Sequence, residues 1–334
     1  MKAMLVGENK RLMWTDVPDP VMGENDVLVE IHAVALNRAD ILQKNGSYPS
    51  PKGWPEWMGL ELAGVITDMG EGAKANSHYQ VGDKVCALVG GGGYAEKIAV
   101  PYELLMPIPK GWSFEEASAI PEAYATSYLN LVIEGHLKKG QTFYMAAGAS
   151  GLASAAIPMG KAAGAYVVTS VQTYEQAEKI KDLGADYIIV QEKESIPEAF
   201  EKLEKEGKPV NVCMDCLSGE DLGKAMPYMA RGGYWVVIST LAGVETNIKL
   251  RPLLTKGLHL VGSMLRNRTN EEKAFILKSL VTELFPHMES GAIKPSIYKV
   301  LPMEQAEEAH GILERFENTG KVVLKVKCKR REKI

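Results

Sequence analysis

A glycine-rich turn lies between an apolar strand pattern and an alanine-rich helix pattern. It reads Gly148-Ala149-Ser150-Gly151-Leu152-Ala153 and follows the apolar run Thr142–Ala147. Small residues let a backbone approach phosphate closely, and the N-terminus of a helix offers free N–H groups to an anion. Any tight strand-to-helix turn can also use glycine, but this setting predicts that residues 148–152 bind the pyrophosphate of a dinucleotide.

The end of the second predicted strand affects the choice of dinucleotide. The segment Ser170–Thr173 contains no Asp or Glu, the residue types that bind the ribose hydroxyls of NAD. A carboxylate there would repel a 2′-phosphate, so its absence favours NADPH as the cofactor. NADH remains possible.

Two hydrophobic patterns divide the 334 residues, a length that favours two domains. In the first hundred residues Val27, Val29 and Ile31 alternate with other side chains and turn signals recur, which favours a small β-barrel-like domain. From about Pro121 apolar strands alternate with helical patterns, as is typical of a doubly wound parallel sheet. We therefore predict an α/β fold with sheet strands at 142–147, 166–170, 187–190, 210–215, 234–239 and 258–262.

Helical patterns complete the prediction. Glu175–Leu183 carries an apolar stripe, and Gly184 supplies the helix stop. A long helix is expected over Asn270–Ser290, and the extended segments 298–301 and 321–326 are expected to rejoin the N-terminal domain. Pro158, in the helix after the glycine turn, is expected to kink that helix at a cost of ~3 kcal/mol.

Composition excludes several function classes. The net charge of −4 shows no basic excess, so we expect no nucleic-acid partner. No run is long and apolar enough to cross a bilayer, and the N-terminus lacks the apolar core of a signal peptide. We therefore expect no membrane partner and a cytoplasmic location, and we interpret the basic C-terminal tail as a solvated terminus.

The cysteines do not indicate a metal or disulfide site. The four are too few and too scattered for a disulfide framework and are expected to be reduced, including Cys328. Cys213 and Cys216 have CxxC spacing, but they lie in Val210–Leu217, which the pattern predicts to be a strand. An offset of three would place them on opposite faces, so we expect a packing role.

Eight short motifs form a more specific pattern than the glycine turn alone. They are Ala35-Leu-Asn-Arg-Ala-Asp40, Gly59-Leu-Glu-Leu-Ala-Gly64, Val81-Gly-Asp-Lys-Val85, Gly91-Gly-Gly-Tyr-Ala-Glu96, Ile120-Pro-Glu-Ala-Tyr124, Leu183-Gly-Ala-Asp186, Met264-Leu-Arg-Asn-Arg268 and Thr319-Gly-Lys-Val-Val323. Their order resembles the medium-chain dehydrogenase/reductase superfamily, within it the zeta-crystallin-like quinone oxidoreductases, and especially the tumour-suppressor-inducible branch. The resemblance covers nearly the whole chain.

This resemblance implies a domain organisation. It implies a GroES-like catalytic domain over residues 1–121, a Rossmann dinucleotide-binding domain over 122–265, and a return to the catalytic domain over 266–334. Nicotinamide and substrate would lie between the domains. A homodimer is also implied, and the apolar edge strand around 258–262 is the expected dimer seam.

The resemblance also implies a site without zinc. Zinc-dependent relatives carry a Cys and a His where this sequence has Asn37 and Leu60, and their four-cysteine lobe is missing here. Asp40 and Glu61 alone would bind zinc poorly. Such a site suits an acceptor that is already electrophilic, a quinone or an α,β-unsaturated carbonyl (enone), which receives hydride from the nicotinamide.

By the same resemblance, Asn37, Asp40 and Tyr48 belong to the substrate side of the site. Amide and phenol groups could hydrogen-bond the substrate carbonyl as negative charge develops there, and Tyr48 is a candidate proton donor. Other interpretations stay open. Asn37 and Asp40 could cap the helix that begins near them, which is compatible with a role in the site, and Tyr48 could be an ordinary loop aromatic.

Cofactor contacts outside the glycine turn are likewise implied by resemblance. Thr126 matches a residue that contacts the nicotinamide, and Arg266 and Lys321 match positions near the cofactor. The alternative interpretations are a helix-surface threonine and two solvated basic residues.

The adenosine half of the implied site departs from the family pattern. The glycine-serine after the second strand reads Gln172-Thr173, the following lysine reads Gln176, and the tyrosine after the third strand reads Gln191. Charge complementarity to a 2′-phosphate is therefore weakened, although Thr173 could donate a hydrogen bond. Two alternatives to a quinone or enone reductase follow: a zinc-free alcohol or acyl-chain reductase, and a non-catalytic nucleotide-binding relative that kept the fold.

Overall fold

The alternating run near the N-terminus forms the long strand β3 (Asp26–Ala35). Val27, Val29, Ile31 and Ala33 are buried, as the pattern predicts, because alternate side chains of a strand point to opposite faces. β3 is the strand around which a seven-stranded sheet is built, with the order β14-β15-β3-β4-β5-β7 and with β6 paired to β3 outside that path.

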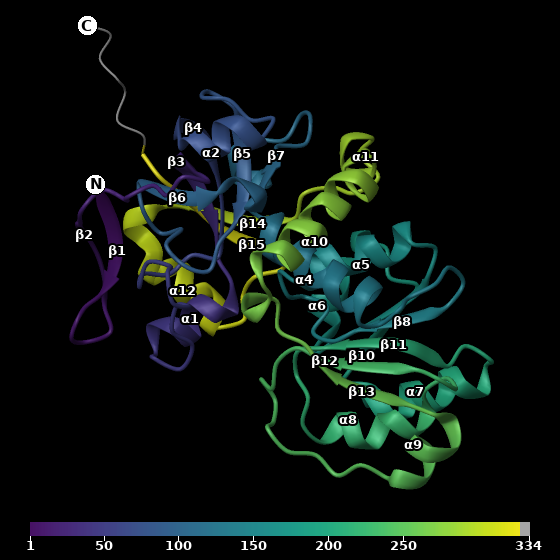
Figure 1. Cartoon of the computed structure of the whole chain (residues 1–334). Coiled ribbons are helices and arrows are strands. Elements are labelled where there is room, and N and C mark those ends of the chain that lie inside the picture. Colours follow the sequence, from purple (N-terminus) through teal and green to yellow (C-terminus); the bar gives the residue numbers. More distant parts are fainter. Residues whose placement is uncertain (328–334) are drawn as a thin grey trace, which may run out of the picture. The chain divides into compact units, whose positions relative to one another are not determined.

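The structure, a computed structural model, describes residues 1–327, so Cys328 and the basic residues after it lie outside the described residues. The chain divides into two compact units, coloured along the sequence in Figure 1. Unit 1 comprises Met1–Ala125 and the chain from Arg266 onward, and unit 2 comprises Thr126–Leu265. The boundary between Ala125 and Thr126 falls within helix α4 (Pro121–Tyr128).

Unit 1 contains the seven-stranded sheet, a separate two-stranded hairpin and short helices. Besides β3, its strands are β1 (Lys2–Val6), β2 (Leu12–Asp16), β4 (Glu61–Met69), β5 (Lys84–Leu88), β6 (Lys97–Pro101), β7 (Leu105–Pro107), β14 (Ile297–Pro302) and β15 (Lys321–Lys325). Its other α-helices are α1 (Arg38–Lys44), α2 (Glu71–Asn76), α3 (Phe114–Ala117), α10 (Asn270–Glu283), α11 (Phe285–Glu289) and α12 (Ala306–Glu314).

The C-terminal segment returns to the N-terminal sheet, as predicted. β15 pairs antiparallel with β3, where Val323 lies opposite Ala35, and β14 pairs parallel with β15. The long helix expected over residues 270–290 is instead two helices, because Pro286 has no N–H to continue the ladder of α10. This return places Arg266 and Lys321 in unit 1.

Unit 2 is built on a parallel sheet with the order β10-β9-β8-β11-β12-β13. In chain order this is 3-2-1-4-5-6, the order of the Rossmann fold, and it confirms the predicted fold class. The strands are β8 (Thr142–Met145), β9 (Tyr166–Val171), β10 (Tyr187–Val190), β11 (Val210–Asp215), β12 (Tyr234–Val237) and β13 (His259–Gly262). The α-helices that lie wholly in this unit are α5 (Ala153–Ala162), α6 (Tyr174–Ile180), α7 (Ile196–Lys205), α8 (Glu220–Ala225) and α9 (Leu250–Lys256).

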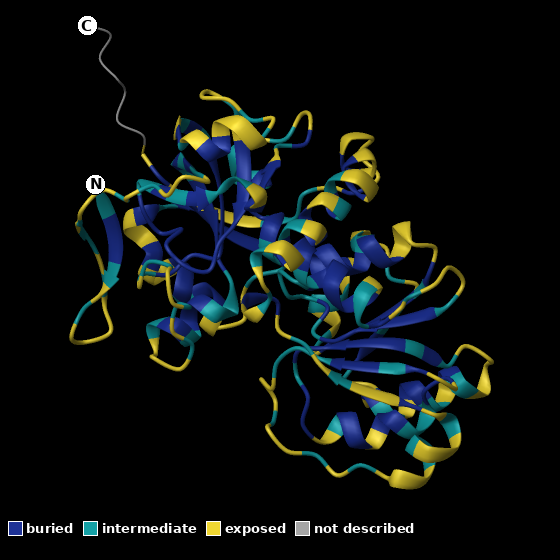
Figure 2. Ribbon diagram, viewed as in Figure 1, coloured by how far each residue is buried: buried dark blue, intermediate teal, exposed yellow. Residues whose placement is uncertain are grey.

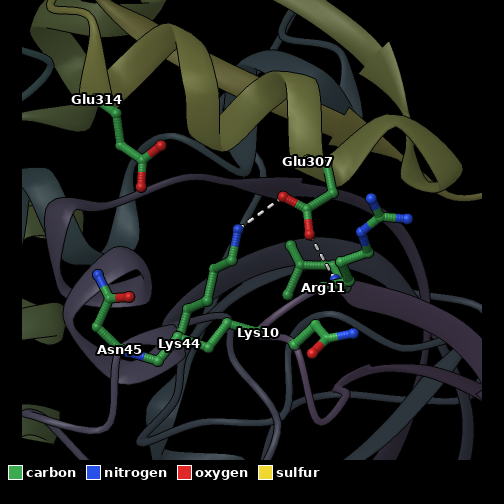
Figure 3. A pocket seen from close by; sticks show the side chains of 8 residues that line it. Lys10, Arg11, Lys44, Asn45, Glu307 and Glu314 are labelled. Atoms are coloured by element: carbon green, nitrogen blue, oxygen red, sulfur yellow. Dashed lines mark hydrogen bonds and ion pairs between the residues drawn. The ribbon is translucent and has the colours of Figure 1, made fainter.

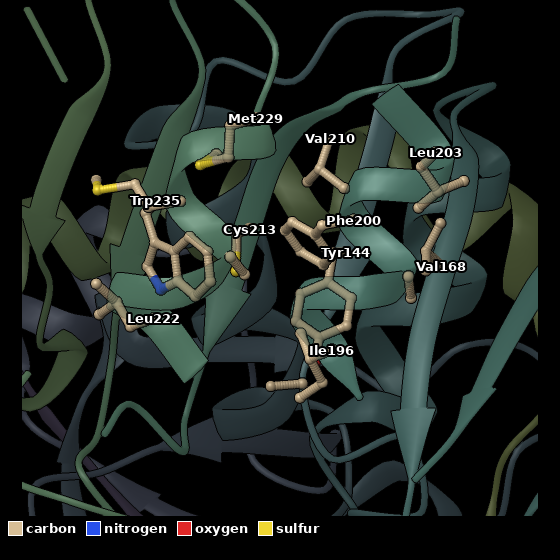
Figure 4. Close-up of a cluster of buried hydrophobic side chains, with 14 of the residues drawn as sticks. Tyr144, Val168, Ile196, Phe200, Leu203, Val210, Cys213, Leu222, Met229 and Trp235 are labelled. Atoms are coloured by element: carbon tan, nitrogen blue, oxygen red, sulfur yellow. The ribbon is translucent and has the colours of Figure 1, made fainter. Parts of the chain in front are cut away.

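The core of unit 2 is aromatic and aliphatic (Figure 4). The rings of Tyr144 and Phe200 meet edge to face with centroids 5.0 Å apart, and Phe200 lies 5.9 Å from Trp235. In Figure 2 the strands β8, β9 and β11 are almost wholly buried, as expected for a parallel sheet with helices on both faces.

One sequence expectation changes in unit 2. The prediction that Cys213 and Cys216 lie on opposite faces of one strand is wrong, because β11 ends at Asp215 and both cysteines join the same apolar cluster. Both are buried, which supports a packing role. Pro158 lies within α5, which continues through it to Ala162, and the kink expected there stays a prediction. Among the described helices, none is long and apolar enough to cross a membrane.

Candidate functional site

The glycine turn in unit 2 presents free amides at the start of α5. The N–H groups of Gly148, Ser150 and Ala153 are bonded within the unit, but within residues 1–327 those of Ala149, Gly151 and Leu152 have no acceptor. The turn is tight: Ala147 has φ +54°, and a Cβ on Gly148 would lie 2.4 Å from Oγ1 of Thr169. Three unpartnered amides at the N-terminus of a ten-residue helix fit the phosphates of a dinucleotide.

The other predicted adenosine-side residues lie at the carboxyl edge of the same sheet. Gln172 follows β9, Gln191 follows β10, and both line a cavity of ≈ 110 Å³. Thr173 is the N-cap residue of α6, and its Oγ1 accepts the N–H of Gln176 at 3.2 Å. Ligands of open parallel sheets bind at this edge, so the structure brings Gln172 and Gln191 together where an adenosine would lie.

An acidic side chain that the sequence analysis missed anchors this cavity. Asp215 accepts hydrogen bonds from Nε1 of Trp235 at 2.8 Å and from the amides of Leu217 and Ser218. Asp221 also lines the cavity, and its pKa is raised by burial and by the charge of Asp215, against the opposing charge of Lys224. No Lys, Arg or His belongs to the lining, so the cavity itself suits a neutral base or a hydroxyl better than a phosphate.

In unit 1, Asn37 lies in a buried network of charges. Nζ of Lys321 donates to Oδ1 of Asn37 at 2.7 Å and pairs with Oε1 of Glu61 at 2.6 Å. Nδ2 of Asn37 donates to the same Glu61 oxygen at 3.0 Å and approaches the carbonyl of Ala35 at 3.4 Å. Both amide hydrogens of Asn37 therefore have acceptors inside the unit.

Asn37 and Asp40 also cap α1, which confirms the capping interpretation. Asn37 is the N-cap residue, and its backbone N–H donates to Oδ2 of Asp40 at 2.8 Å. Oδ1 of Asp40 accepts the amide of Gly59 at 3.0 Å. Burial raises the pKa of Asp40 to about 6 although both backbone hydrogen bonds and Lys321 oppose the shift.

Tyr48 is half-buried and lies against Arg266. The guanidinium carbon is 4.5 Å from the ring centroid, and Nη1 donates to the backbone carbonyl of Tyr48 at 3.1 Å. Burial and then the charge of Glu122 raise the pKa of the Tyr48 phenol, and Arg266 opposes the shift.

Glu122 is the second functional candidate that the sequence analysis missed. It lies in the first turn of α4, and its backbone N–H donates to Oε2 of Glu61 at 2.8 Å. Burial and the nearby Glu61 raise its pKa to about 7. A carboxyl that titrates near neutral pH beside a phenol can control proton transfer.

Thr126 lies in α4 within unit 2, where it is half-buried and its carbonyl accepts Nδ2 of Asn130 at 2.7 Å.

A separate open pocket of ≈ 580 Å³ lies on unit 1, lined by Asn9–Leu12, Lys44, Asn45, Glu307 and Glu314 (Figure 3). Lys44 and Glu307 pair across it at 2.6 Å. None of the predicted site residues lines this pocket.

The donor set around Asn37 does not fit a tetrahedral zinc ion. The two expected ligand positions hold an amide and the buried, apolar Leu60. The oxygens of Asn37 and Glu61 already face the Lys321 ammonium, which would repel a metal cation. Across residues 1–327 no group of three or more His, Cys, Asp or Glu side chains is arranged to hold a metal.

Comparison with known proteins matches parts of both units to dehydrogenase families. Residues 23–110 match the family model of the alcohol dehydrogenase GroES-like domain, and residues 151–280 match that of zinc-binding dehydrogenase. The quinone oxidoreductase of Sus scrofa is 27% identical, over 93% of this chain and 92% of its own length. The acryloyl-coenzyme A reductase of Sulfurisphaera tokodaii is 27% identical, over 97% of this chain and 100% of its own.

Solved structures show the same fold. The quinone oxidoreductase of Thermus thermophilus, also solved as a complex with NADPH, superposes with a TM-score of 0.79 at 27% identity and covers 97% of this chain and 100% of its own. The JamJ enoyl reductase superposes with a TM-score of 0.84 at 23% identity, covering 98% of this chain and 99% of its own.

Proposed function

Since this chain belongs to the medium-chain dehydrogenase/reductase superfamily and is an oxidoreductase of the zeta-crystallin-like type, we propose that it transfers hydride from NADPH to a quinone or an α,β-unsaturated carbonyl without zinc. The observation that carries the proposal is the Lys321 ammonium, bonded to Glu61 and to Asn37, the position at which zinc-dependent relatives are expected to carry a ligand. A site without a Lewis acid suits an acceptor that is already electrophilic.

The dinucleotide part of the proposal rests on unit 2. The free amides of Ala149, Gly151 and Leu152 would bind the pyrophosphate, and Gln172, Thr173 and Gln191 would lie along the adenosine, with Thr126 toward the nicotinamide. NADPH is favoured because Gln172 and Thr173, the two residues directly after β9, carry no carboxylate. NADH is the second candidate because the cavity at Gln172 and Gln191 has no cationic lining residue.

In unit 1 the residues would bind and protonate the acceptor. When bound, the nicotinamide would supply the hydride. The half-buried Tyr48 would donate the proton that the reduced acceptor needs, while Asp40 and Lys321 would hold Asn37 and the start of α1 in place. Because both amide hydrogens of Asn37 are engaged, Tyr48 is the better donor to a substrate oxygen.

The acceptor can be a quinone or an activated alkene, and the relatives support both. One relative is named a quinone oxidoreductase and another an acryloyl-coenzyme A reductase, so an unsaturated acyl thioester is included among the alkenes. An alcohol substrate would need polarisation that this donor set does not provide.

The test is calorimetric titration of the protein with NADPH and NADH, followed by turnover assays with a simple quinone, an enone and an enoyl thioester. Binding with turnover of one of these acceptors supports the proposal. Binding without turnover would favour the nucleotide-binding alternative, and failure to bind either dinucleotide would overturn both.

We also propose a homodimer and a cytoplasmic location. The edge strand β13 has one unpaired side among the described strands, and Leu260 on it is 45% exposed. An exposed apolar edge strand is suited to pairing with a second copy. Sedimentation equilibrium of the protein and of Leu260→Lys would test the dimer.

A further inference from the structure

Arg266 is a buried arginine whose donors all point into unit 1. It is 6% exposed. Nε and Nη2 both donate to the carbonyl of Gly90, at 2.9 and 2.6 Å, Nη1 donates to the carbonyl of Tyr48 at 3.1 Å, and Nη2 also donates to Oε1 of Gln43 at 2.9 Å. The planar fork of the guanidinium is therefore used to hold two backbone segments together.

The segment that Arg266 holds is the loop that carries Tyr48. Gln43, which accepts from Arg266, in turn donates to Oγ of Ser50 at 2.9 Å and to the carbonyl of Glu56 at 2.8 Å. Nζ of Lys273 donates to the carbonyl of Arg266 at 3.0 Å and fixes the backbone of the arginine itself. Tyr48 thus lies between anchored points on both sides.

The charge of Arg266 lacks an ion-pair partner among residues 1–327, since every acceptor it contacts is neutral. A buried cation without an ion pair is costly to desolvate, and here that cost is offset by hydrogen bonds to neutral acceptors and by more distant negative charges. The groups that face it are the Tyr48 ring at 4.5 Å and, acting through their charges, the carboxyls of Asp40 and Glu122. Of these, only Tyr48 is in direct contact with the guanidinium, through its ring and its backbone carbonyl.

We propose that Arg266 is a positioning residue for Tyr48: it fixes the Tyr48 loop and stabilises the phenolate left when Tyr48 gives up its proton. This inference rests on the proposed function. After the acceptor has received hydride, its oxygen carries a negative charge; the O–H bond of Tyr48 breaks, the proton passes to that oxygen, and the phenolate then takes a proton from water. In this role Arg266 acts on proton transfer rather than on binding of the dinucleotide.

Kinetics can separate these two roles. We expect Arg266→Gln to lower kcat ~10-fold or more, as loss of an effective acid does, and to leave the Kd of NADPH within about twofold. Arg266→Lys, which keeps the charge, should recover part of kcat. Tyr48→Phe should lower kcat similarly, and the double variant should be little worse than either single one. The matched control is Arg268→Gln, on a partly exposed arginine two residues along the chain, which should change neither quantity.

A second readout does not depend on activity. With 3,5-difluorotyrosine placed at position 48, the phenol titrates at a lower pH and its ¹⁹F shift reports the pKa. Arg266→Gln should raise that pKa by about 1 or more, and Arg266→Lys should change it little. An unchanged pKa in Arg266→Gln, or a weaker NADPH affinity with kcat retained, would overturn the inference. If the wild-type protein reduces no acceptor, the proposed function fails while the titration still decides the role of Arg266.

Discussion

Nζ of Lys321 lies 2.6 Å from Oε1 of Glu61, and the two side chains are only 5% and 0% exposed. Lys321 begins β15 and Glu61 begins β4, so the pair links the C-terminal return to the N-terminal half of the same sheet. A buried pair of this kind is sensitive to loss of one partner, because the remaining charge has no water to solvate it.

The first prediction is that Lys321→Met lowers the free energy of unfolding by about 3–5 kcal/mol, because Glu61 is left as an uncompensated buried charge. Urea denaturation at pH 7 measures it. Lys325→Met on the same strand is the control: Lys325 pairs with Glu115 but is 62% exposed, so its loss should change stability by about 1 kcal/mol or less. Equal effects of the two substitutions would contradict the burial argument.

The second prediction concerns the pH dependence of turnover. The pKa of Glu122 is about 7, and its ionised form raises the pKa of Tyr48 and makes it a weaker acid. The kcat of the wild-type protein should therefore fall as the pH rises through about 7, whereas Glu122→Gln should lack this step. Rates measured from pH 5.5 to 9 test it, with the exposed Glu103→Gln as control. The same inflection in Glu122→Gln would exclude Glu122 as its cause.

The third prediction concerns the glycine turn. In Gly148→Ala the new Cβ would meet Oγ1 of Thr169, which is held by its hydrogen bond to the carbonyl of Met145 at 2.8 Å. We expect a loss of about 1–3 kcal/mol in stability, as for other overpacked sites, together with weaker NADPH binding because the free amides shift. Thermal unfolding and calorimetry measure the two effects. Unchanged stability and NADPH affinity in Gly148→Ala would contradict the close contact with Thr169.

The fourth prediction concerns His310, which is 0% exposed and bonded through Nε2 to the Tyr94 hydroxyl at 3.2 Å. Burial, and then Lys44, lower its pKa from 6.5 to about 4. Between these values the unfolded chain binds a proton and the folded one does not, so folding stability is lost as the pH falls. Relative to His310→Gln, the wild-type protein should lose about 1.4 kcal/mol for each unit of pH below 6.5 until pH 4.

Urea unfolding at several pH values between 4.5 and 7 provides the test of the fourth prediction. The control is His287→Gln, on an exposed histidine. Its free energy of unfolding should change with pH over this range as that of the wild-type protein does. Parallel curves for His310→Gln and the wild-type protein would show that the buried imidazole is not the source of the slope.

The elements of the fold follow closely from local patterns. The alternation of apolar residues correctly predicts which face of β3 is buried. The six predicted strands of the parallel sheet match β8 to β13 apart from their ends. β12 stops at Val237, two residues before the predicted end, and the helix expected over 270–290 divides at Leu284. Where a strand or helix ends depends on the segments packed around it and on single residues such as Pro286. The periodicity of apolar residues carries neither kind of information.

The site is only partly visible in the sequence. The glycine turn and the cap at Asn37 are local features, and local rules find them. The bond from Lys321 to Asn37 joins residues 284 positions apart, and it forms because β15 pairs with β3. No rule based on sequence spacing predicts a contact between residues so far apart in the chain. Glu122 did leave a signal, a single acidic residue directly after Pro121 in an apolar stretch at a helix start. The structure shows it to be half-buried, with a raised pKa.

Trp235 gives unit 2 a built-in optical probe. It is the only tryptophan among residues 126–265, the other four being Trp14, Trp54, Trp57 and Trp112. Its indole lines the cavity with Gln172 and Gln191 and is fixed by Asp215, so an adenosine placed there would change the surroundings of one chromophore. In a variant whose other tryptophans are phenylalanine, quenching of indole emission on nucleotide addition would report occupancy of this cavity alone, independent of any reaction.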